Sequence, residues 1–152
     1  MQVSVITPVY NAEKFLRQAV FSALALEEVG EIILIEDNSP DGALKVCQEL
    51  EAEHERVKLF RHPNGENRGA SASRNLGIKV ANCEYISFLD ADDFFAPDRF
   101  SHTKKIFSEK PGADGVYEAI GIFKETPDKY KLYSVLEPIQ PKKLFHYLPS
   151  VP

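Results

Sequence analysis

Four short apolar runs, separated by stretches with helical periodicity, constrain the fold of this 152-residue chain more than any other feature. The runs are Val3–Thr7, Glu31–Glu36, Val57–Arg61 and Glu84–Leu89. The first two are almost continuously apolar and rich in β-branched residues, which is typical of strands buried on both faces of a sheet. Strands that alternate with helices predict βαβ units, and therefore an α/β fold with a mostly parallel sheet and flanking helices.

The helices between these runs are predicted from their apolar spacing. Pro8 ends the first strand, Asn11 is the expected cap of the first helix, and Glu13 is expected in its first turn, where the helix dipole favours an acid. The apolar stripe of that helix consists of Phe15, Leu16, Ala19, Val20, Ala23 and Leu24. Further helices are predicted over Leu44–Ala52 and Ala72–Ala81, and from Pro97 onward.

The last third of the chain has a different pattern. Asp114–Glu125 and Lys129–Leu136 partly alternate between polar and apolar residues, which predicts two strands that pair antiparallel. Gln140–Leu148 is expected to begin a last helix. The length of the chain fits one domain with a core of its own.

Charge and cysteine content exclude several classes of protein. The net charge is −5, and residues 1–100 carry 10 basic and 17 acidic side chains, which argues against non-specific nucleic-acid binding. Cys47 and Cys83 lack the spacing of metal ligands and are predicted to be free thiols. Because no stretch has the pattern of a signal peptide or the length of a membrane span, we expect a cytoplasmic protein. Docking at the inner face of a membrane stays open.

Acidic side chains follow the fourth strand directly. Asp90 and Asp92 are two residues apart, so in an extended segment their carboxylates point to the same side. Such a pair can hold a hard divalent cation, whose other ligands are water and phosphate oxygens. A capping turn of solvated acids before the helix at Pro97 is an equally good interpretation of this spacing alone.

Two other strand ends carry polar segments. Asp37 follows the second strand and could accept hydrogen bonds from a ribose or a base, or could form a local turn through its own backbone. Asn67–Asn75 combines a glycine with Arg68 and Arg74 at the start of a helix, where backbone N–H groups and guanidinium groups suit an anion. A plain glycine turn with surface arginines is the alternative.

The four segments SVITPVYN, IEDNSPDG, NRGASASRN and FLDADD occur in this order at successive strand ends. Together they resemble the nucleotide-sugar-binding half of a family two glycosyltransferase with the Rossmann-like GT-A fold. The resemblance covers about residues 2–100. It implies a nucleotide-sugar-binding region at 1–100, and a partial continuation toward an acceptor-binding half at 101–152 within the same domain.

The resemblance implies an inverting transferase that acts in polysaccharide biosynthesis. The expected donor is a nucleoside diphosphate sugar, with UDP as the expected nucleotide, and Mn²⁺ or Mg²⁺ is the expected cofactor. The expected acceptor is a hydroxyl group of a carbohydrate or of another molecule. A dehydrogenase of the Rossmann type is excluded, because the turn after the first strand lacks the glycines that such enzymes need.

The resemblance also assigns residues to the nucleoside. Thr7, Pro8 and Tyr10 are expected to line its pocket, with Tyr10 against the base. Asp37 matches the acid that usually binds the edge of uracil. Glu36 and Asn38 stand where the family often has Asp and Gly, which leaves guanine and thymine open as alternatives to uracil.

The remaining assignments concern the diphosphate and the cation. Arg74 matches the arginine of the family's Ala-Arg-Asn signature, although Ser73 replaces the alanine. Asp92 is the expected metal ligand, and Asp90 is expected near both the ribose and the metal. Asp93 is expected to support these two acids or to cap the following helix.

The catalytic base is expected outside this chain. The family places it in a later half, and the downstream acids Glu118, Glu125, Asp128 and Glu137 do not stand in its motif. The alternative function is therefore a module that binds nucleotide sugars without turnover. The apolar residues Leu144, Phe145, Tyr147 and Leu148 are a candidate surface for self-association.

Overall fold

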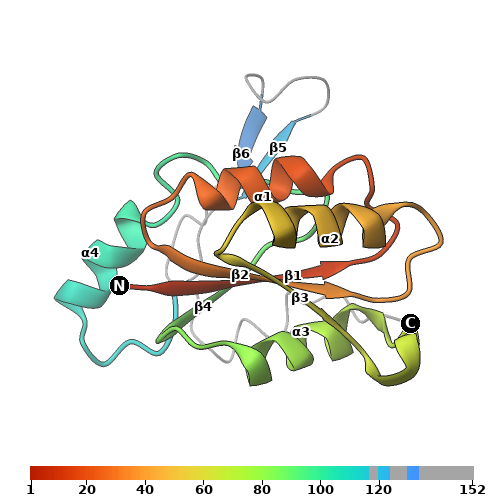
Figure 1. Cartoon of the computed structure of the whole chain (residues 1–152). Helices are drawn as coiled ribbons and strands as arrows, with labels where there is room; N and C mark the ends of the chain where they lie inside the picture. The colour runs from red at the N-terminus through yellow and green to blue at the C-terminus, as the bar shows by residue number, and fades with distance from the viewer. Residues whose placement is uncertain (117–119, 124–129, 134–152) are drawn as a thin grey trace, which may run out of the picture. The chain divides into compact units, whose positions relative to one another are not determined.

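The computed structural model describes residues 1–116, 120–123 and 130–133 (Figure 1). Two compact units can be distinguished, Met1–Glu109 and Lys110–Pro152. The first unit extends past residue 100 and includes the helix that begins at Ser101. Each unit is described by itself.

The first unit is built around a parallel sheet of four strands in the order β3-β2-β1-β4. The strands are β1 (Val3–Val9), β2 (Val29–Glu36), β3 (Val57–Arg61) and β4 (Tyr85–Phe88). The helices are α1 (Leu16–Leu24), α2 (Ala43–Glu53), α3 (Gly69–Val80) and α4 (Ser101–Glu109), and Pro63–Gly65 forms a 3₁₀ turn. The predicted α/β fold with a parallel sheet is confirmed.

Two layers of helices cover the sheet. In Figure 1, α1 and α2 lie on one face and α3 lies on the other. Alternate residues of a strand point to opposite faces, so Val5 joins the core beneath α1 and α2, whereas Ile6 packs beneath α3. This burial on both faces explains why the first two strands read as almost continuous apolar runs.

The start of α1 differs from the prediction. The helix begins at Leu16, and no side chain caps it. Asn11 instead adopts a left-handed conformation with φ 54°, which asparagine tolerates better than most residues, and it turns the chain at the end of β1. The carboxylate of Glu13 accepts a hydrogen bond from the N–H of Gly42 and so joins two loops.

The second unit contains a two-stranded antiparallel sheet, β5 (Ile120–Phe123) and β6 (Tyr130–Tyr133). The predicted antiparallel pairing is therefore confirmed for the described residues. Three predictions lie outside the described residues: the last helix at Gln140–Leu148, the apolar surface within it, and the acids Glu118, Glu125, Asp128 and Glu137. None of the described helices is long and apolar enough to cross a membrane.

Candidate functional site

A cavity of about 250 Å³ lies at the carboxyl ends of β1, β2 and β4, beside the start of α3. This is the edge where open parallel sheets bind their ligands. The cavity is lined by Pro8, Val9, Tyr10, Asn11, Ala12, Phe15, Asp37, Ala70, Arg74, Asp90, Ala91 and Asp92. The fold therefore brings together six of the seven side chains that the sequence assigned to a donor site.

Thr7 is the exception. Its side chain is fully buried within β1 and does not belong to the cavity lining. Among the residues that the structure describes, its Oγ1 has no hydrogen-bond partner. Thr7 therefore does not line this cavity, because it lies within the sheet, where it pairs with Leu34 of β2. Its contact with a nucleoside stays a prediction.

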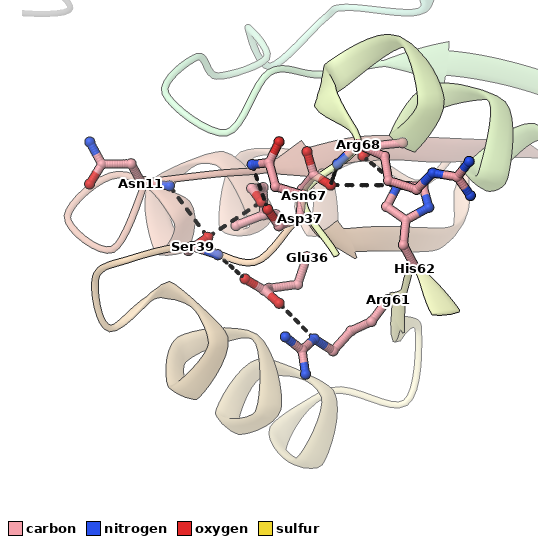
Figure 2. A network of polar contacts seen from close by, with 10 residues as sticks. Asn11, Glu36, Asp37, Ser39, Arg61, His62, Asn67 and Arg68 are labelled. Carbon is pink, nitrogen blue, oxygen red and sulfur yellow. Dashed lines mark hydrogen bonds and ion pairs between the residues drawn. The ribbon is translucent and has the colours of Figure 1, made fainter. Parts of the chain in front are cut away.

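Asp37 follows β2 directly and is 1% exposed. Its side chain caps the start of α3, although it is about 30 residues away in the sequence (Figure 2). Its carboxylate accepts the N–H groups of Arg68 at 2.7 Å and Gly69 at 2.8 Å, while the side-chain amide of Asn67 donates to its carbonyl oxygen. Gly69 has φ +81°, a conformation that favours glycine. The anion expected at this helix start is thus supplied by the protein itself, and this contact starts α3 three residues before the predicted Ala72.

Glu36, the residue before Asp37, is buried as well. Alternation along the strand sends its side chain the other way, where Oε2 accepts Arg61 Nε at 2.7 Å and Oε1 accepts the N–H of Ser39 at 2.6 Å (Figure 2). These contacts shape the loop after β2. Ser39 in turn accepts a hydrogen bond from the N–H of Asn11 in the neighbouring loop.

Arg74 and Asp90 form an ion pair across the cavity. Arg74 Nη2 donates to Asp90 Oδ1 at 2.5 Å, and the Phe88 ring lies 6.0 Å from the guanidinium carbon. Arg74 comes from the middle of α3 and Asp90 from the segment after β4. The pair therefore joins two of the elements that build the site.

The acids after β4 form a turn and not the predicted extended segment. The N–H of Asp93 donates to the carbonyl of Asp90 at 3.0 Å. Asp90 and Asp92 both reach the cavity, whereas Asp93 is absent from its lining. Burial, followed by the nearby charges of Asp92 and Asp90, raises the pKa of the Asp93 carboxyl above its ordinary value.

The turn after β4 supplies some of the ligands that a hard divalent cation needs. Asp90 and Asp92 offer carboxylate oxygens, the ligand type that Mg²⁺ and Mn²⁺ prefer. No group of three or more His, Cys, Asp or Glu side chains within the described ranges could hold a metal ion. A cation bound here would therefore take its other ligands from water and from a ligand's oxygens.

Phe15 and His62 belong to this region although the sequence did not identify them. Phe15 lines the cavity and is 50% exposed, much like Tyr10 at 54%, so it does not belong to the buried stripe of α1. Adjacent residues of a helix point in different directions, so Phe15 and Leu16 do not both point to the centre of the core. This spacing could have indicated that Phe15 is exposed. His62 is buried beside Asp37, and no local pattern indicated that.

The protein is an α/β protein with an open parallel sheet, and its partly acidic, partly aromatic cavity lies at the carboxyl ends of the strands, where such sheets bind their ligands. The family model of glycosyl transferase family 2 matches residues 4–150, and the chain belongs to this family. A curated relative from Haemophilus influenzae, an uncharacterized glycosyltransferase, is 42% identical over 99 residues, which are 64% of this chain and 38% of that protein. This chain thus spans well under half of that relative's length.

Two solved structures share the fold. Staphylococcus aureus TarS 1-349 in complex with UDP-GlcNAc superimposes with a TM-score of 0.63 at 22% identity, covering 80% of this chain and 40% of that one. A mannosyltransferase from Pyrobaculum calidifontis, in complex with GDP-Man and Mn²⁺, gives 0.62 at 21% identity, covering 82% of this chain and 36% of that one. The predicted glycosyltransferase fold is confirmed.

Proposed function

We propose that this chain forms the donor site of an inverting glycosyltransferase that moves a sugar from a nucleoside diphosphate sugar, with UDP as the nucleotide, to an acceptor hydroxyl. The observation that carries the proposal is the composition of one cavity. Aromatic side chains (Tyr10 and Phe15), a guanidinium (Arg74) and a pair of carboxylates (Asp90 and Asp92) line it together. Aromatic rings can pack against a base, a guanidinium can pair with a diphosphate, and two carboxylates can hold a cation that neutralises the diphosphate.

Each group has a chemical task in this proposal. Tyr10 and Phe15, both about half exposed, would pack against the base and ribose. Arg74 would exchange part of its pairing with Asp90 for diphosphate oxygens. Asp90 and Asp92 would hold Mn²⁺ or Mg²⁺, which when bound supplies positive charge to the diphosphate leaving group.

Asp37 has a narrower role than the sequence suggested. Its two carboxylate oxygens already accept backbone N–H groups of α3, so its observed work is to fix that helix. Each carboxylate oxygen has a second lone pair, and the residue borders the cavity. Contact of Asp37 with the base edge therefore stays part of the proposal.

The test is the binding of UDP to the full chain by calorimetry, with Mn²⁺ and with EDTA. Asp92→Asn should weaken UDP at least tenfold in Mn²⁺, since the cation loses a negatively charged ligand, and EDTA should do the same to the wild type. Asp98→Asn is the matched control, because Asp98 is an exposed acid that does not line the cavity. Equal UDP affinity in Mn²⁺ and EDTA would contradict the metal assignment, and GDP and dTDP compared alongside would establish the base.

Binding of a nucleotide sugar without turnover is the second candidate. Among the lining residues, Asp37 is engaged with α3 and Asp90 with Arg74, while Asp92 is assigned to the cation. That leaves no carboxylate of the cavity to deprotonate an acceptor, which inversion requires. An assay of sugar transfer by this chain over a panel of acceptors decides between the two functions.

A cytoplasmic location stays a prediction.

A further inference from the structure

His62 is a buried imidazole at the junction of three elements of the donor site. It follows β3 directly and is only 6% exposed. Its Nε2 lies 3.1 Å from Ser73 Oγ on α3 and 3.6 Å from Asp37 Oδ1 at the end of β2 (Figure 2 shows His62 beside Asp37 and Arg68). The imidazole therefore contacts both Asp37, which follows β2, and Ser73, which lies on α3.

Ser73 connects this ring to α3, the helix that carries Arg74 of the cavity lining. It is fully buried on the inner side of α3, and the next residue in the helix is Arg74. The same helix is fixed at its start by the Asp37 carboxylate, through the N–H groups of Arg68 and Gly69. His62 adds a second attachment one turn further along, at the level from which Arg74 extends to Asp90.

Stability alone does not require a polar pair here. Replacing both partners of a buried hydrogen bond by apolar groups of similar shape is often nearly neutral. A hydrogen bond adds a preferred direction and distance to the packing of the helix on the sheet. The advantage of the pair is therefore the orientation of α3, and with it the position of the guanidinium.

We propose that His62 is a positioning residue of the donor site: through Ser73 it holds α3 so that Arg74 stays in line with Asp90 and with the diphosphate of a bound nucleotide. This inference rests on the proposed function. Ser73, which stands where the family's signature has alanine, gives His62 its hydrogen-bond partner, so the two residues act as a unit.

The first arm of the test measures UDP affinity in Mn²⁺ by calorimetry. His62→Leu should weaken UDP at least fivefold, and His62→Gln, which can still reach a hydroxyl, should recover much of the loss. His54→Leu is the matched control, since His54 lies between α2 and the amino end of β3, at the other end of the strand from His62, and packs edge-on against Phe21. Circular dichroism identifies a temperature at which all variants are folded. Wild-type affinity in folded His62→Leu would overturn the proposal.

The second arm does not need a nucleotide. In ¹⁵N spectra of arginine side chains, the guanidinium of Arg74 in its pair with Asp90 should show a distinct signal with restricted rotation. His62→Leu should broaden or shift this signal, and His54→Leu should not. If the wild type fails to bind UDP, the proposed function falls, but this arm still decides whether His62 positions Arg74. An unchanged Arg74 signal in His62→Leu would refute the positioning role.

Discussion

At the scale of single residues, the site depends on buried carboxylates that each have hydrogen-bond or ion-pair partners. Glu36 and Asp37 are adjacent, both about 1% exposed, and they point to opposite faces of the sheet. Burying a charge costs several kcal/mol unless it is paired and hydrogen-bonded. Hydrogen bonds from Arg61 and from the N–H of Ser39 offset the cost of burying Glu36, and N–H groups at the start of α3 offset the cost of burying Asp37. The two acids thus fix the two loops that flank the cavity.

Cys47 gives a prediction about alkaline stability. Burial, and then the negative charge of Glu36, raises the pKa of its thiol to about 12. In the unfolded chain a thiol titrates near pH 8.5, so its contribution to stability is full below that pH and is lost as the pH rises toward 12. Between pH 8 and pH 10 the wild type should lose about 1–2 kcal/mol more than Cys47→Ala does.

Urea unfolding at both pH values measures this difference, and the variant controls for lysines and tyrosines that titrate in the same range. Cys47→Ala should be less stable at pH 8, because the small cavity costs about 1 kcal/mol or more. If the free energies of unfolding of the wild type and Cys47→Ala fall by the same amount from pH 8 to pH 10, the raised pKa of the Cys47 thiol is contradicted.

At the scale of elements, α3 approaches the sheet closely where it crosses β1. A Cβ added to Gly77 would lie 2.3 Å from Cγ2 of Ile6, a distance that real side chains do not reach. The helix also carries Ser73 and Arg74, so its distance from the sheet sets the depth of the site. A glycine is needed here for close packing and not for an unusual backbone angle.

Gly77→Ala should therefore destabilise the protein. Helix propensity would gain up to about 1 kcal/mol, but overpacking costs typically 1–3 kcal/mol, and the clash with a central strand decides the sign. Urea unfolding should show a lower midpoint. Gly112→Ala is the control, since no described residue apart from its chain neighbours lies within 4 Å of an added Cβ, and it should change stability by less than about 0.5 kcal/mol.

A double variant separates the clash from other causes. Ile6→Ala removes the atom in question, so Gly77→Ala should cost less in that background than in the wild type. Additive costs would indicate that the glycine is needed for a reason other than contact with Ile6.

At the scale of the whole molecule, the first unit contains its own core. Both clusters of buried apolar residues are built from residues between Val3 and Phe100. The helix α4 is attached to this unit by the ion pair of Lys104 with Glu28 and by the Tyr85 and Phe107 rings, whose centroids are 5.0 Å apart.

A chain of residues 1–109 should therefore fold by itself, with a cooperative urea transition and the helix content of the first unit. Residues 1–100, which lack α4, should be less stable by about 1–2 kcal/mol, because an aromatic pair and an ion pair are lost. Circular dichroism during urea titration compares the two. A non-cooperative transition for 1–109 would show that its stability depends on the second unit.

The sequence by itself determined the elements and most of the candidate site. Strand and helix patterns repeat every two or 3.6 residues, so Val57–Arg61 was predicted to the residue and the parallel sheet followed from the alternation. Parallel strands place their carboxyl ends at one edge, so the polar segments after the strands could be expected to lie there. The family resemblance then assigned Tyr10, Arg74 and Asp92 to one site, and all three line the cavity.

Only the tertiary structure decided how these residues are held. Asp37 contacts N–H groups 31 and 32 residues further along the chain, and His62 contacts Ser73 across a loop. The same structure buried Thr7, exposed Phe15 and folded Asp90–Asp93 into a turn. Local periodicity specifies which face of an element is buried. Loop closure and the packing of α3 on β1 determine which side chains then come within a few ångströms of each other, and no local pattern records those distances.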